Sequence, residues 1–479
     1  MKSGDVRGLA GLNPRLTAGD NGAWGLTLLL ALVVLLSRLP LLGHGYGSDP
    51  DAWRAISAAQ RLLDTGTYLP SRVPGYPLPE YVDAIMLYLG AGSFGIGLIS
   101  AVLSGASAAL FFQLLLPLGR TRAVAGTLAL SLTPVFYVAG LGSMDYLWGL
   151  TFFLAATLCM LSGRVWLAAI FLGLAAASRP SYALAIIPLG LLYVDYDLRQ
   201  LRNPVVWRHL AALALCSGLI TLAFFLPAFL NIGVQVPKVY GNWAYVAYNS
   251  TLGLFGFAGF VGVACAVVSA WINKRRGIPL PDFVGRKLNG WALTVLILYG
   301  LIFVQLPDEA SYLMPALLGL YWLLCRYARY IMLWVLTALL LVSCFLFSLD
   351  RHQGIKGFNM SGPVIREIEI QNERSCVAAV VKRKLAASPD GLDYVIVGAY
   401  RPQLLVQVGA PLSERVLYTV RPASDGKLVD TERVPLPSNA RLLLLDRTTN
   451  QQSEEWPIPE GRVAVMDSYQ DCPRQSSTV

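Results

Sequence analysis

Long apolar runs separated by short polar segments fill the first three quarters of the chain. A helix needs roughly 20 residues to cross the ~30 Å hydrocarbon core of a bilayer, and these runs approach that length. We place the predicted membrane-spanning helices at 23–42, 94–118, 123–141, 145–162, 164–178, 181–197, 209–230, 251–272, 288–305, 311–326 and 329–349. The pattern therefore predicts a mostly α-helical, multi-span transmembrane bundle of about 11 spans.

The pattern changes after residue 349. A helix is predicted at 362–387, and four short apolar runs bounded by turn residues follow at 394–397, 416–420, 442–445 and 463–466. Such runs are typical of buried strands, and we expect them to form a small mixed sheet. The chain is thus expected to have three parts: a cytoplasmic tail at 1–22, a transmembrane module at 23–349 with a first outer loop at 43–93, and a soluble α/β domain at 350–479.

Composition and charge agree with a membrane protein. Hydrophobic residues make up 55% of the chain and charged residues 14%, as is usual for this class. Before residue 350, one set of alternate loops carries 16 Lys and Arg and the other carries 6. Because cytoplasmic loops are the basic ones, we expect a multi-pass protein of the inner or plasma membrane with its N-terminus in the cytoplasm and its C-terminal domain outside. This topology accounts for the net charge of +9, and no nucleic-acid partner is expected.

Two features concern export. The first apolar run lies behind a tail of 22 residues, is too long for the apolar part of a signal peptide and lacks a small-residue cleavage site, so we do not expect its removal. Cys376 and Cys472 are the two cysteines of the predicted outer domain. An exported compartment permits a disulfide between them, and the sequence leaves their pairing open.

Several charged residues fall on the same outer face by topology alone. Acidic or basic side chains at a membrane surface are costly to bury, so their convergence indicates a functional site. The predicted topology brings together Asp49 and Asp51 after the first span, Asp145 before the fourth, Arg179 after the fifth, and Asp308 with Glu309 after the ninth.

Asp49 is the candidate general base. An alcohol that attacks a sugar must lose a proton, and a carboxylate within about 3 Å of the hydroxyl can accept it. The Ser48-Asp49-Pro50 sequence also predicts a helix N-cap with proline at the first helical position, and the two roles are compatible. Asp51 would lie in the first turn, where a carboxylate complements the helix dipole. The Asp-x-Asp spacing also suits a divalent cation, so the metal question stays open.

Arg72 and Arg179 are candidates for binding a phosphate group. The guanidinium fork matches phosphate oxygens, although Arg179 could also be a helix-end side chain that extends to the interface. Glu309 joins Asp49 and Asp51 as a candidate catalytic residue. The supporting or substrate-binding candidates are Asp145, Tyr76, Asp308, Tyr312 and Arg54.

Taken in order, these motifs resemble those of one enzyme family. They are Ser48-Asp49-Pro50-Asp51, the Arg72-Val-Pro-Gly-Tyr-Pro turn, Asp145 after Gly142-Ser-Met, Ala177-Ser-Arg179-Pro180, and Pro307-Asp-Glu309-Ala-Ser-Tyr312-Leu-Met-Pro315. The chain is similar here, over about residues 23–330, to polytopic membrane glycosyltransferases of the C superfamily, close in layout to protein O-mannosyltransferases and lipid A aminoarabinose transferases.

The resemblance implies a glycosyltransferase that uses a polyprenyl-phosphate sugar donor, inverts the anomeric carbon and employs a first-loop Asp, here Asp49, as base. Its partners would be that donor, the lipid bilayer and an acceptor glycan, lipid or protein. No cofactor is firmly implied, and a divalent cation is possible. The two first-loop acids are split by Pro50 instead of adjacent, which leaves open which of them acts as base.

Two other classes were weighed against this enzyme. A transporter or lipid flippase would place ionisable groups near the bilayer midplane and often shows inverted repeats, whereas the predicted spans are nearly free of charge and no repeat is evident. A function as an envelope assembly protein, with the outer domain binding a partner, would not explain the acidic residues on the outer face. The sequence therefore favours the glycosyltransferase.

Overall fold

The computed structural model describes residues 21–233, 242–275, 282–349, 358–388, 391–397, 401–418, 441–445, 463–466 and 472. The predicted tail at 1–22 lies almost wholly outside the described residues, as does much of the predicted domain at 350–479. The domain boundaries therefore stay predictions. Where the chain is described it is mostly helical, as the sequence predicts.

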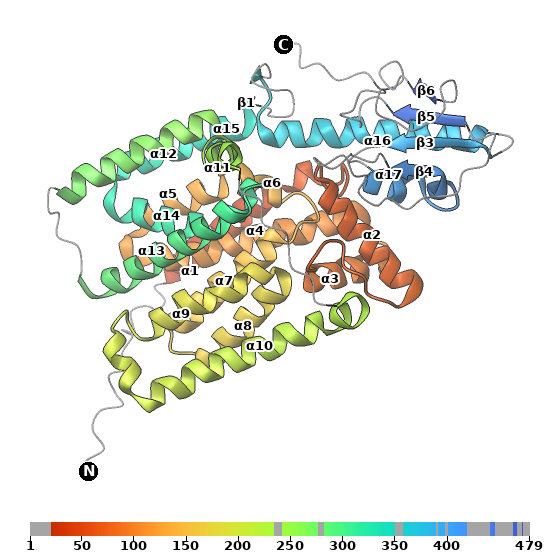
Figure 1. The fold of residues 1–479 in the computed structure, drawn as a ribbon. Helices are drawn as coiled ribbons and strands as arrows, with labels where there is room; N and C mark the ends of the chain where they lie inside the picture. Colours follow the sequence, from red (N-terminus) through yellow and green to blue (C-terminus); the bar gives the residue numbers. More distant parts are fainter. Residues whose placement is uncertain are drawn as a thin grey trace.

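A bundle of apolar helices forms most of the molecule (Figure 1). Its α-helices are α1 (Asn21–Leu36), α4 (Gly92–Leu115), α5 (Arg120–Ser131), α6 (Pro134–Ala139), α7 (Tyr146–Leu161), α8 (Val165–Ser178), α9 (Ile186–Tyr193), α10 (Pro204–Ile232), α11 (Trp243–Asn249), α12 (Leu252–Arg275), α13 (Asp282–Gln305), α14 (Met314–Tyr327) and α15 (Tyr330–Phe345). Short 3-10 helices occur at η3 (Leu39–Leu41), η4 (Leu116–Leu118), η5 (Pro180–Ala185), η6 (Leu198–Arg202) and η7 (Ala310–Leu313).

Each predicted span coincides with one of these helices or with two consecutive ones. Within the described part of the chain, five helical segments are long and apolar enough to cross a membrane: Gly22–Leu41, Gly92–Leu118, Pro204–Ile232, Leu252–Arg275 and Gly285–Gln305. Four more apolar helices are shorter: Tyr146–Leu161, Val165–Ser178, Pro180–Tyr193 and Tyr330–Phe345. The multi-span helical character is confirmed, while the number of crossings stays a prediction.

One predicted span is broken in a way that matters for the site. The segment predicted at 123–141 divides into α5 and α6, because Pro134 disfavours a helical conformation at Thr133, which is extended. α6 is then short, and the chain leaves it at Gly140 to form the turn that carries Ser143 and Asp145. The break therefore brings a polar turn to the end of the bundle.

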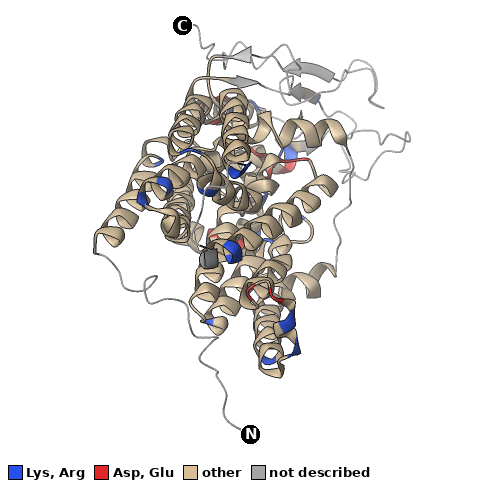
Figure 2. Ribbon diagram, turned by 90° about the vertical axis from the view of Figure 1, so that its left-hand side faces the viewer, with Lys and Arg blue, Asp and Glu red and all other residues tan. Residues whose placement is uncertain are grey.

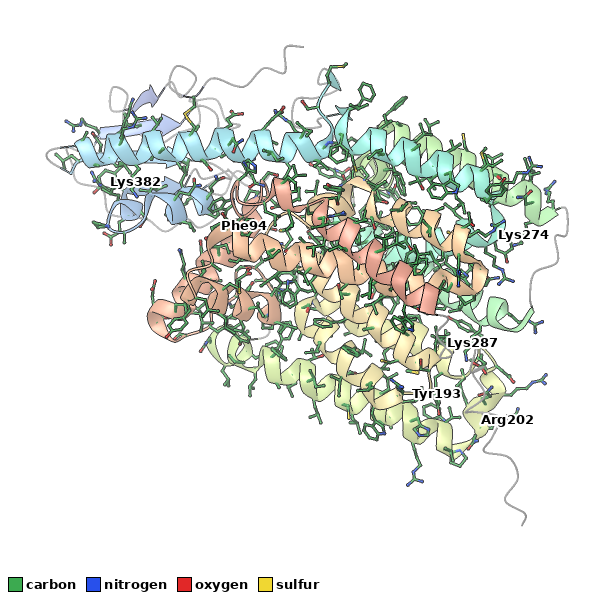
Figure 3. All side chains as sticks on the ribbon, turned by 180° about the vertical axis from the view of Figure 1, so that it is seen from behind. Phe94, Tyr193, Arg202, Lys274, Lys287 and Lys382 are labelled. Carbon is green, nitrogen blue, oxygen red and sulfur yellow. A yellow bond between two sulfur atoms is a disulfide. The ribbon has the colours of Figure 1, made fainter. Side chains whose placement is uncertain are left out.

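Charged residues are sparse along the bundle helices (Figure 2). The labelled side chains of Arg202, Lys274 and Lys287 lie toward one end of the molecule, whereas Phe94 and Lys382 lie toward the other (Figure 3). The predicted topology places those three basic residues on one membrane face, and in the structure they lie toward the same end of the molecule. Which face is cytoplasmic stays a prediction.

The first outer loop folds into two helices, α2 (Pro50–Thr65) and α3 (Pro77–Tyr88). Small and aromatic residues of α2 recur at helical spacing and are buried, among them Ala52, Trp53 and Ile56. The helix ends at Gly66, whose φ of 67° is a conformation that glycine adopts without strain. α2 and α3 thus form an ordered platform at one end of the bundle (Figure 1).

The C-terminal part contains α16 (Pro363–Ala387), α17 (Arg401–Val408), the 3-10 helix η9 (Leu412–Arg415) and a four-stranded sheet. The strands are β3 (Asp393–Val397), β4 (Val416–Tyr418), β5 (Arg441–Leu445) and β6 (Val463–Met466), in the order β4-β3-β5-β6. A two-stranded antiparallel pair, β1 (Ser348–Leu349) and β2 (Phe358–Asn359), precedes α16. The predicted helix and the four strand positions are confirmed, apart from 419–420, which lie outside the described residues.

The prediction of a mixed sheet is wrong for the described strands, because all three of their pairings are parallel. Helix α17 lies between β3 and β4 in the chain, as the crossover of a parallel pair requires. Nearly continuous apolar runs are also typical of parallel strands. A disulfide joins Cys376 of α16 to Cys472, so the pairing that the sequence left open is present.

Candidate active site

Asp49 is the N-cap of α2. Pro50 occupies the first helical position, Asp49 has an extended backbone, and its Oδ1 accepts a hydrogen bond of 2.8 Å from the backbone N–H of Asp51. The indole Nε1 of Trp53 donates to the carbonyl of Gly47 at 2.7 Å and fixes the preceding loop. The predicted cap is confirmed, and it presents the second carboxylate oxygen of Asp49 from a rigid helix start.

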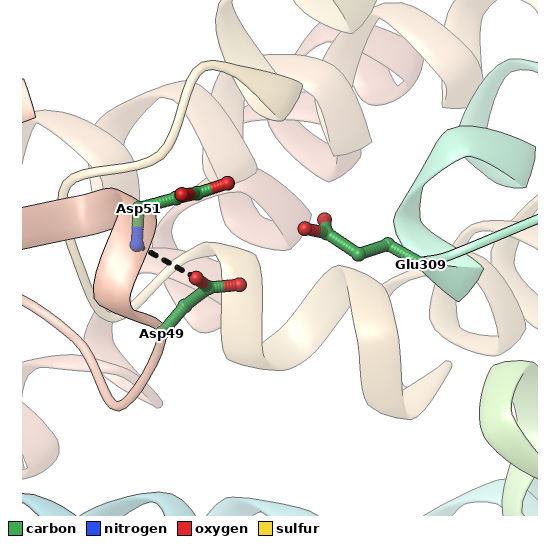
Figure 4. Close-up of side chains that lie close together, drawn as sticks. All are labelled: Asp49, Asp51 and Glu309. Atoms are coloured by element: carbon green, nitrogen blue, oxygen red, sulfur yellow. Dashed lines mark hydrogen bonds between the residues drawn. The ribbon is translucent and has the colours of Figure 1, made fainter. Parts of the chain in front are cut away.

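Glu309 comes from the other half of the chain to meet these two acids. It precedes η7 in the turn between α13 and α14. One carboxylate oxygen from each of Asp49, Asp51 and Glu309 lies within 4.8 Å of the others, and the three side chains point toward one another (Figure 4). We call this group the carboxylate cluster.

A chain of ion pairs borders the carboxylate cluster. Arg72 donates to Asp51 at 2.5 Å and to Asp145 at 2.8 Å. Arg179 donates to the other oxygen of Asp145. Asp145 is 2% exposed, so two guanidiniums share one buried carboxylate. Arg54 also bonds Asp51, at 2.5 Å, from a more exposed position.

Asp49 and Glu309 have no such ion pair among the described residues. Burial raises the pKa of Asp49, the negative charge of Asp51 raises it further, and the nearby Arg72 only partly opposes this. Burial and the charge of Asp49 likewise hold the pKa of Glu309 well above its usual range. The hydroxyl of Tyr146 donates to Glu309. Because the two carboxyls repel each other when both are ionised, they titrate as a pair.

Tyrosine rings hold the two arginines in place. The guanidinium of Arg72 lies 4.3 Å from the ring centre of Tyr76, and that of Arg179 lies 4.4 Å from Tyr146 and 4.5 Å from Tyr312. Such contacts fix a guanidinium without using its N–H donors. The Nε of Arg72 is buried and finds no acceptor among the described residues, which leaves a donor for a ligand.

Two cavities meet at this site. The larger, of about 510 Å³, is lined by polar residues such as Arg179 and Asp308 and by apolar residues such as Ile302, Leu306 and Pro315. We call it the arginine cavity.

The smaller cavity, of about 260 Å³, is lined by Ser48, Asp49, Met144 and Glu367 among others. We call it the Asp49 cavity. Tyr146 and Ser311 line both cavities, so the carboxylate side and the guanidinium side of the site face a common wall.

The structure brings together most of the residues predicted for the site. Asp49, Asp51, Glu309, Arg72, Arg179, Asp145, Tyr76, Tyr312 and Arg54 all contact the carboxylate cluster or its ion-pair chain. Asp308 instead lines the arginine cavity with an exposed side chain, and its carbonyl accepts from Asn249. His44, in the turn before α2, lies outside this group, and its Nδ1 is 3.0 Å from Oδ1 of Asn372.

Sequence reasoning missed three further acids. Glu80 and Asp83 of α3 are buried, and Asp83 accepts a 2.6 Å hydrogen bond from Ser143. Burial raises the pKa of each to about 7. Their spacing with Ala84 on one helix face was a usable signal. The third is Glu367 of α16, which accepts from the backbone N–H of Ser48 at 2.5 Å and could not be placed without the tertiary fold.

The carboxylate cluster also offers a site for a metal ion. Its three side chains supply only oxygen ligands, which are the ligands that hard divalent cations such as Mg²⁺ or Ca²⁺ prefer. The excess of negative charge at Asp49 and Glu309 would be relieved by such an ion. The residues present therefore fit a divalent cation.

No family model matches the chain, and no curated protein matches it. The solved structures that are similar in fold include polytopic membrane glycosyltransferases of the C superfamily, the class that the sequence motifs resemble.

One is ArnT from Cupriavidus metallidurans bound to undecaprenyl phosphate, with 18% identity and a TM-score of 0.45 over 64% of this chain and 60% of that chain. Another is arabinosyltransferase EmbB from Mycobacterium smegmatis, with 16% identity and a TM-score of 0.40 over 67% and 32%. A third is the Archaeoglobus fulgidus oligosaccharyltransferase tethered to an acceptor peptide, with 11% identity and a TM-score of 0.45 over 83% and 64%. The chain spans less than two thirds of each of those proteins. At these TM-scores the likenesses assign no role to any residue of the present chain.

Proposed function

We propose that this chain is an inverting membrane glycosyltransferase. It would move a sugar from a polyprenyl-phosphate-linked donor to an acceptor glycan, lipid or protein at the outer membrane face. One observation carries the proposal: the carboxylate cluster of Asp49, Asp51 and Glu309 borders a buried arginine pair where two cavities share a wall.

The arginine cavity suits the donor. Its lining combines the guanidinium of Arg179 with apolar side chains such as Ile302 and Leu306, and a donor that carries both a phosphate and an isoprenoid chain needs both kinds of contact. Arg179, with Arg72 beside it, would bind the phosphate by charge-assisted hydrogen bonds. The same positive charge stabilises the phosphate as it leaves, so departure needs no proton from an acid.

The Asp49 cavity suits the acceptor. A hydroxyl placed there would lose its proton to the Asp49 carboxylate while its oxygen forms the new bond to the anomeric carbon. The bond from that carbon to the phosphate oxygen breaks, and the electron pair leaves with the phosphate. Attack from one cavity with departure into the other gives inversion. The raised pKa of Asp49 makes its carboxylate a stronger base than an exposed aspartate.

A divalent cation is the second element of the proposal. Asp49, Asp51 and Glu309 would hold it through one oxygen each, and it would add positive charge toward the donor phosphate. The arginines supply such charge on their own, so transfer without added metal is compatible with the site.

The test is transfer of labelled sugar from a polyprenyl-phosphate donor by the full chain in liposomes. Asp49→Asn should lower the rate by roughly 10²–10⁴-fold, as expected for loss of a general base. Asp64→Asn is the matched control, since Asp64 is an exposed acid at the far end of the same helix. Undiminished transfer by Asp49→Asn would rule out Asp49 as the base.

A further inference from the structure

A third cavity lies between α2 and α17, separate from the two cavities of the candidate active site. It has a volume of about 410 Å³, and its lining includes Arg54, Arg61, Arg401, Ser57 and Ser71. Among the described residues that line it, three are arginines and none is acidic. We call it the basic pocket.

Two different elements supply the arginines. Arg54 and Arg61 are seven residues apart in the sequence, so they lie two turns apart on one face of α2. Arg401 begins α17, which lies against α2 (Figure 1). Its Nε donates to the carbonyl of Val416 at 3.2 Å, which holds the side chain in the pocket wall.

The electrostatics of the basic pocket favour an anion. Arg54 also bonds Asp51, and an anion in the pocket would lie close to three guanidinium groups that attract it. The first turn of α17, including Pro402, also lines the pocket, and the start of a helix carries partial positive charge. Arginine forks bind phosphate and carboxylate groups in particular.

We propose that the basic pocket binds a phosphate or carboxylate group of the acceptor, and that the acceptor is therefore an anionic glycan. This rests on the glycosyltransferase function proposed above. Arg54 lines the pocket and also bonds Asp51 of the carboxylate cluster, so the two sites share a residue. Asp49 and Arg61 are separated by roughly 18 Å along the axis of α2. The acceptor must then be an extended molecule, with its anionic group in the pocket and its reacting hydroxyl at Asp49.

The probe is sodium pyrophosphate, titrated by calorimetry into the full chain in phosphatidylcholine nanodiscs. We expect the wild type to bind it and Arg61→Gln to weaken binding about tenfold or more, because a charge-assisted hydrogen bond is lost. Arg383→Gln is the matched control, since it removes an exposed arginine of α16 that does not line the pocket. An absence of wild-type binding, or an equal loss in Arg383→Gln, would overturn the proposal.

A second arm separates a soluble anion from a lipid headgroup. The titration is repeated in nanodiscs that contain phosphatidylglycerol. If the wild type loses pyrophosphate binding only there, while Arg61→Gln shows no such difference, a headgroup occupies the pocket and the acceptor assignment fails. Binding that is retained in both lipids supports a soluble acceptor.

A third arm separates this proposal from the proposed function. Asp49→Asn should bind pyrophosphate like the wild type, because Asp49 does not line the basic pocket. Asp49-dependent sugar transfer without Arg61-dependent binding would overturn the pocket alone. Arg61-dependent binding without any sugar transfer would overturn the enzyme and, with it, the assignment of the anion to an acceptor.

Discussion

Two sets of buried carboxyls near the first outer loop differ in what faces them. Asp145 is bonded by the guanidiniums of Arg72 and Arg179. Glu80 and Asp83 are bonded instead by hydroxyl groups, such as that of Ser143 on Asp83. A buried carboxylate between guanidiniums is compensated in charge, whereas one among hydroxyls holds its proton more tightly, and burial raises the pKa of both Glu80 and Asp83 to about 7. Buried carboxyls near the first outer loop are thus held in two ways, by guanidinium groups at Asp145 and by hydroxyl groups at Glu80 and Asp83, and the latter two gain protons as the pH falls below about 7.

Replacing Asp145 should have the largest effect on stability. Asp145→Asn removes the one carboxylate shared by Arg72 and Arg179, which leaves Arg72 with Asp51 alone and the buried Arg179 without its carboxylate. Breaking a buried pair in this way destabilises a protein by roughly 3–5 kcal/mol. The measurement is a melting curve of the full chain in detergent. Asp83→Asn, measured at about pH 6, is the control and should lose far less, because the protonated carboxyl and the amide are alike. Equal losses would contradict the contrast between the two sets.

The contribution of Asp83 to stability should depend on pH. Its pKa is raised to about 7 in the folded protein from an ordinary value of about 4. The folded state therefore binds more protons than the unfolded state between these values, so the contribution of Asp83 is fully present below about pH 4 and is lost as the pH rises toward 7. The slope approaches ~1.4 kcal/mol per pH unit. In Asp83→Asn the slope of unfolding free energy across that range should fall by up to this amount relative to the wild type, while the contribution of Glu80 remains. A slope equal to that of the wild type would mean that Asp83 is already ionised.

A divalent cation bound at the carboxylate cluster should have a smaller effect on stability. This cluster is distinct from both Asp145 and the pair of Glu80 and Asp83. Ca²⁺ at ten times its dissociation constant would stabilise the fold by about 1.4 kcal/mol. The gain should be larger at about pH 8 than at about pH 6, because the raised pKa values of Asp49 and Glu309 let protons compete with the ion. Glu309→Gln should remove most of the gain, and Asp64→Asn should not. A melting temperature that does not respond to Ca²⁺ at either pH would exclude the site.

Local rules made part of this site predictable from the sequence. The Ser48-Asp49-Pro50 cap depends only on neighbouring residues, and the alternation of apolar and polar segments was enough to place Asp49 and Glu309 on one face. The central position of Asp145 between two arginines was not predictable, because it depends on how α7 and α8 pack. The burial of Glu80 and Asp83 and the approach of Glu367 to Ser48 depend on tertiary contacts in the same way. The strand positions followed from apolar runs, but their parallel direction did not.

The contact between α16 and Ser48 has a consequence for how the two halves of the molecule communicate. Glu367 accepts from both the N–H and the hydroxyl of Ser48, and Arg374 donates to the carbonyl of the same residue. The peptide groups on both sides of Ser48 are therefore hydrogen-bonded to α16, and the disulfide to Cys472 leaves the same helix at Cys376, two residues beyond Arg374. We expect a displacement of α16 to move Ser48 through these hydrogen bonds, and with it the neighbouring Asp49. The sheet packs against α16 through β3, so α16 connects the C-terminal sheet to the loop that carries Asp49.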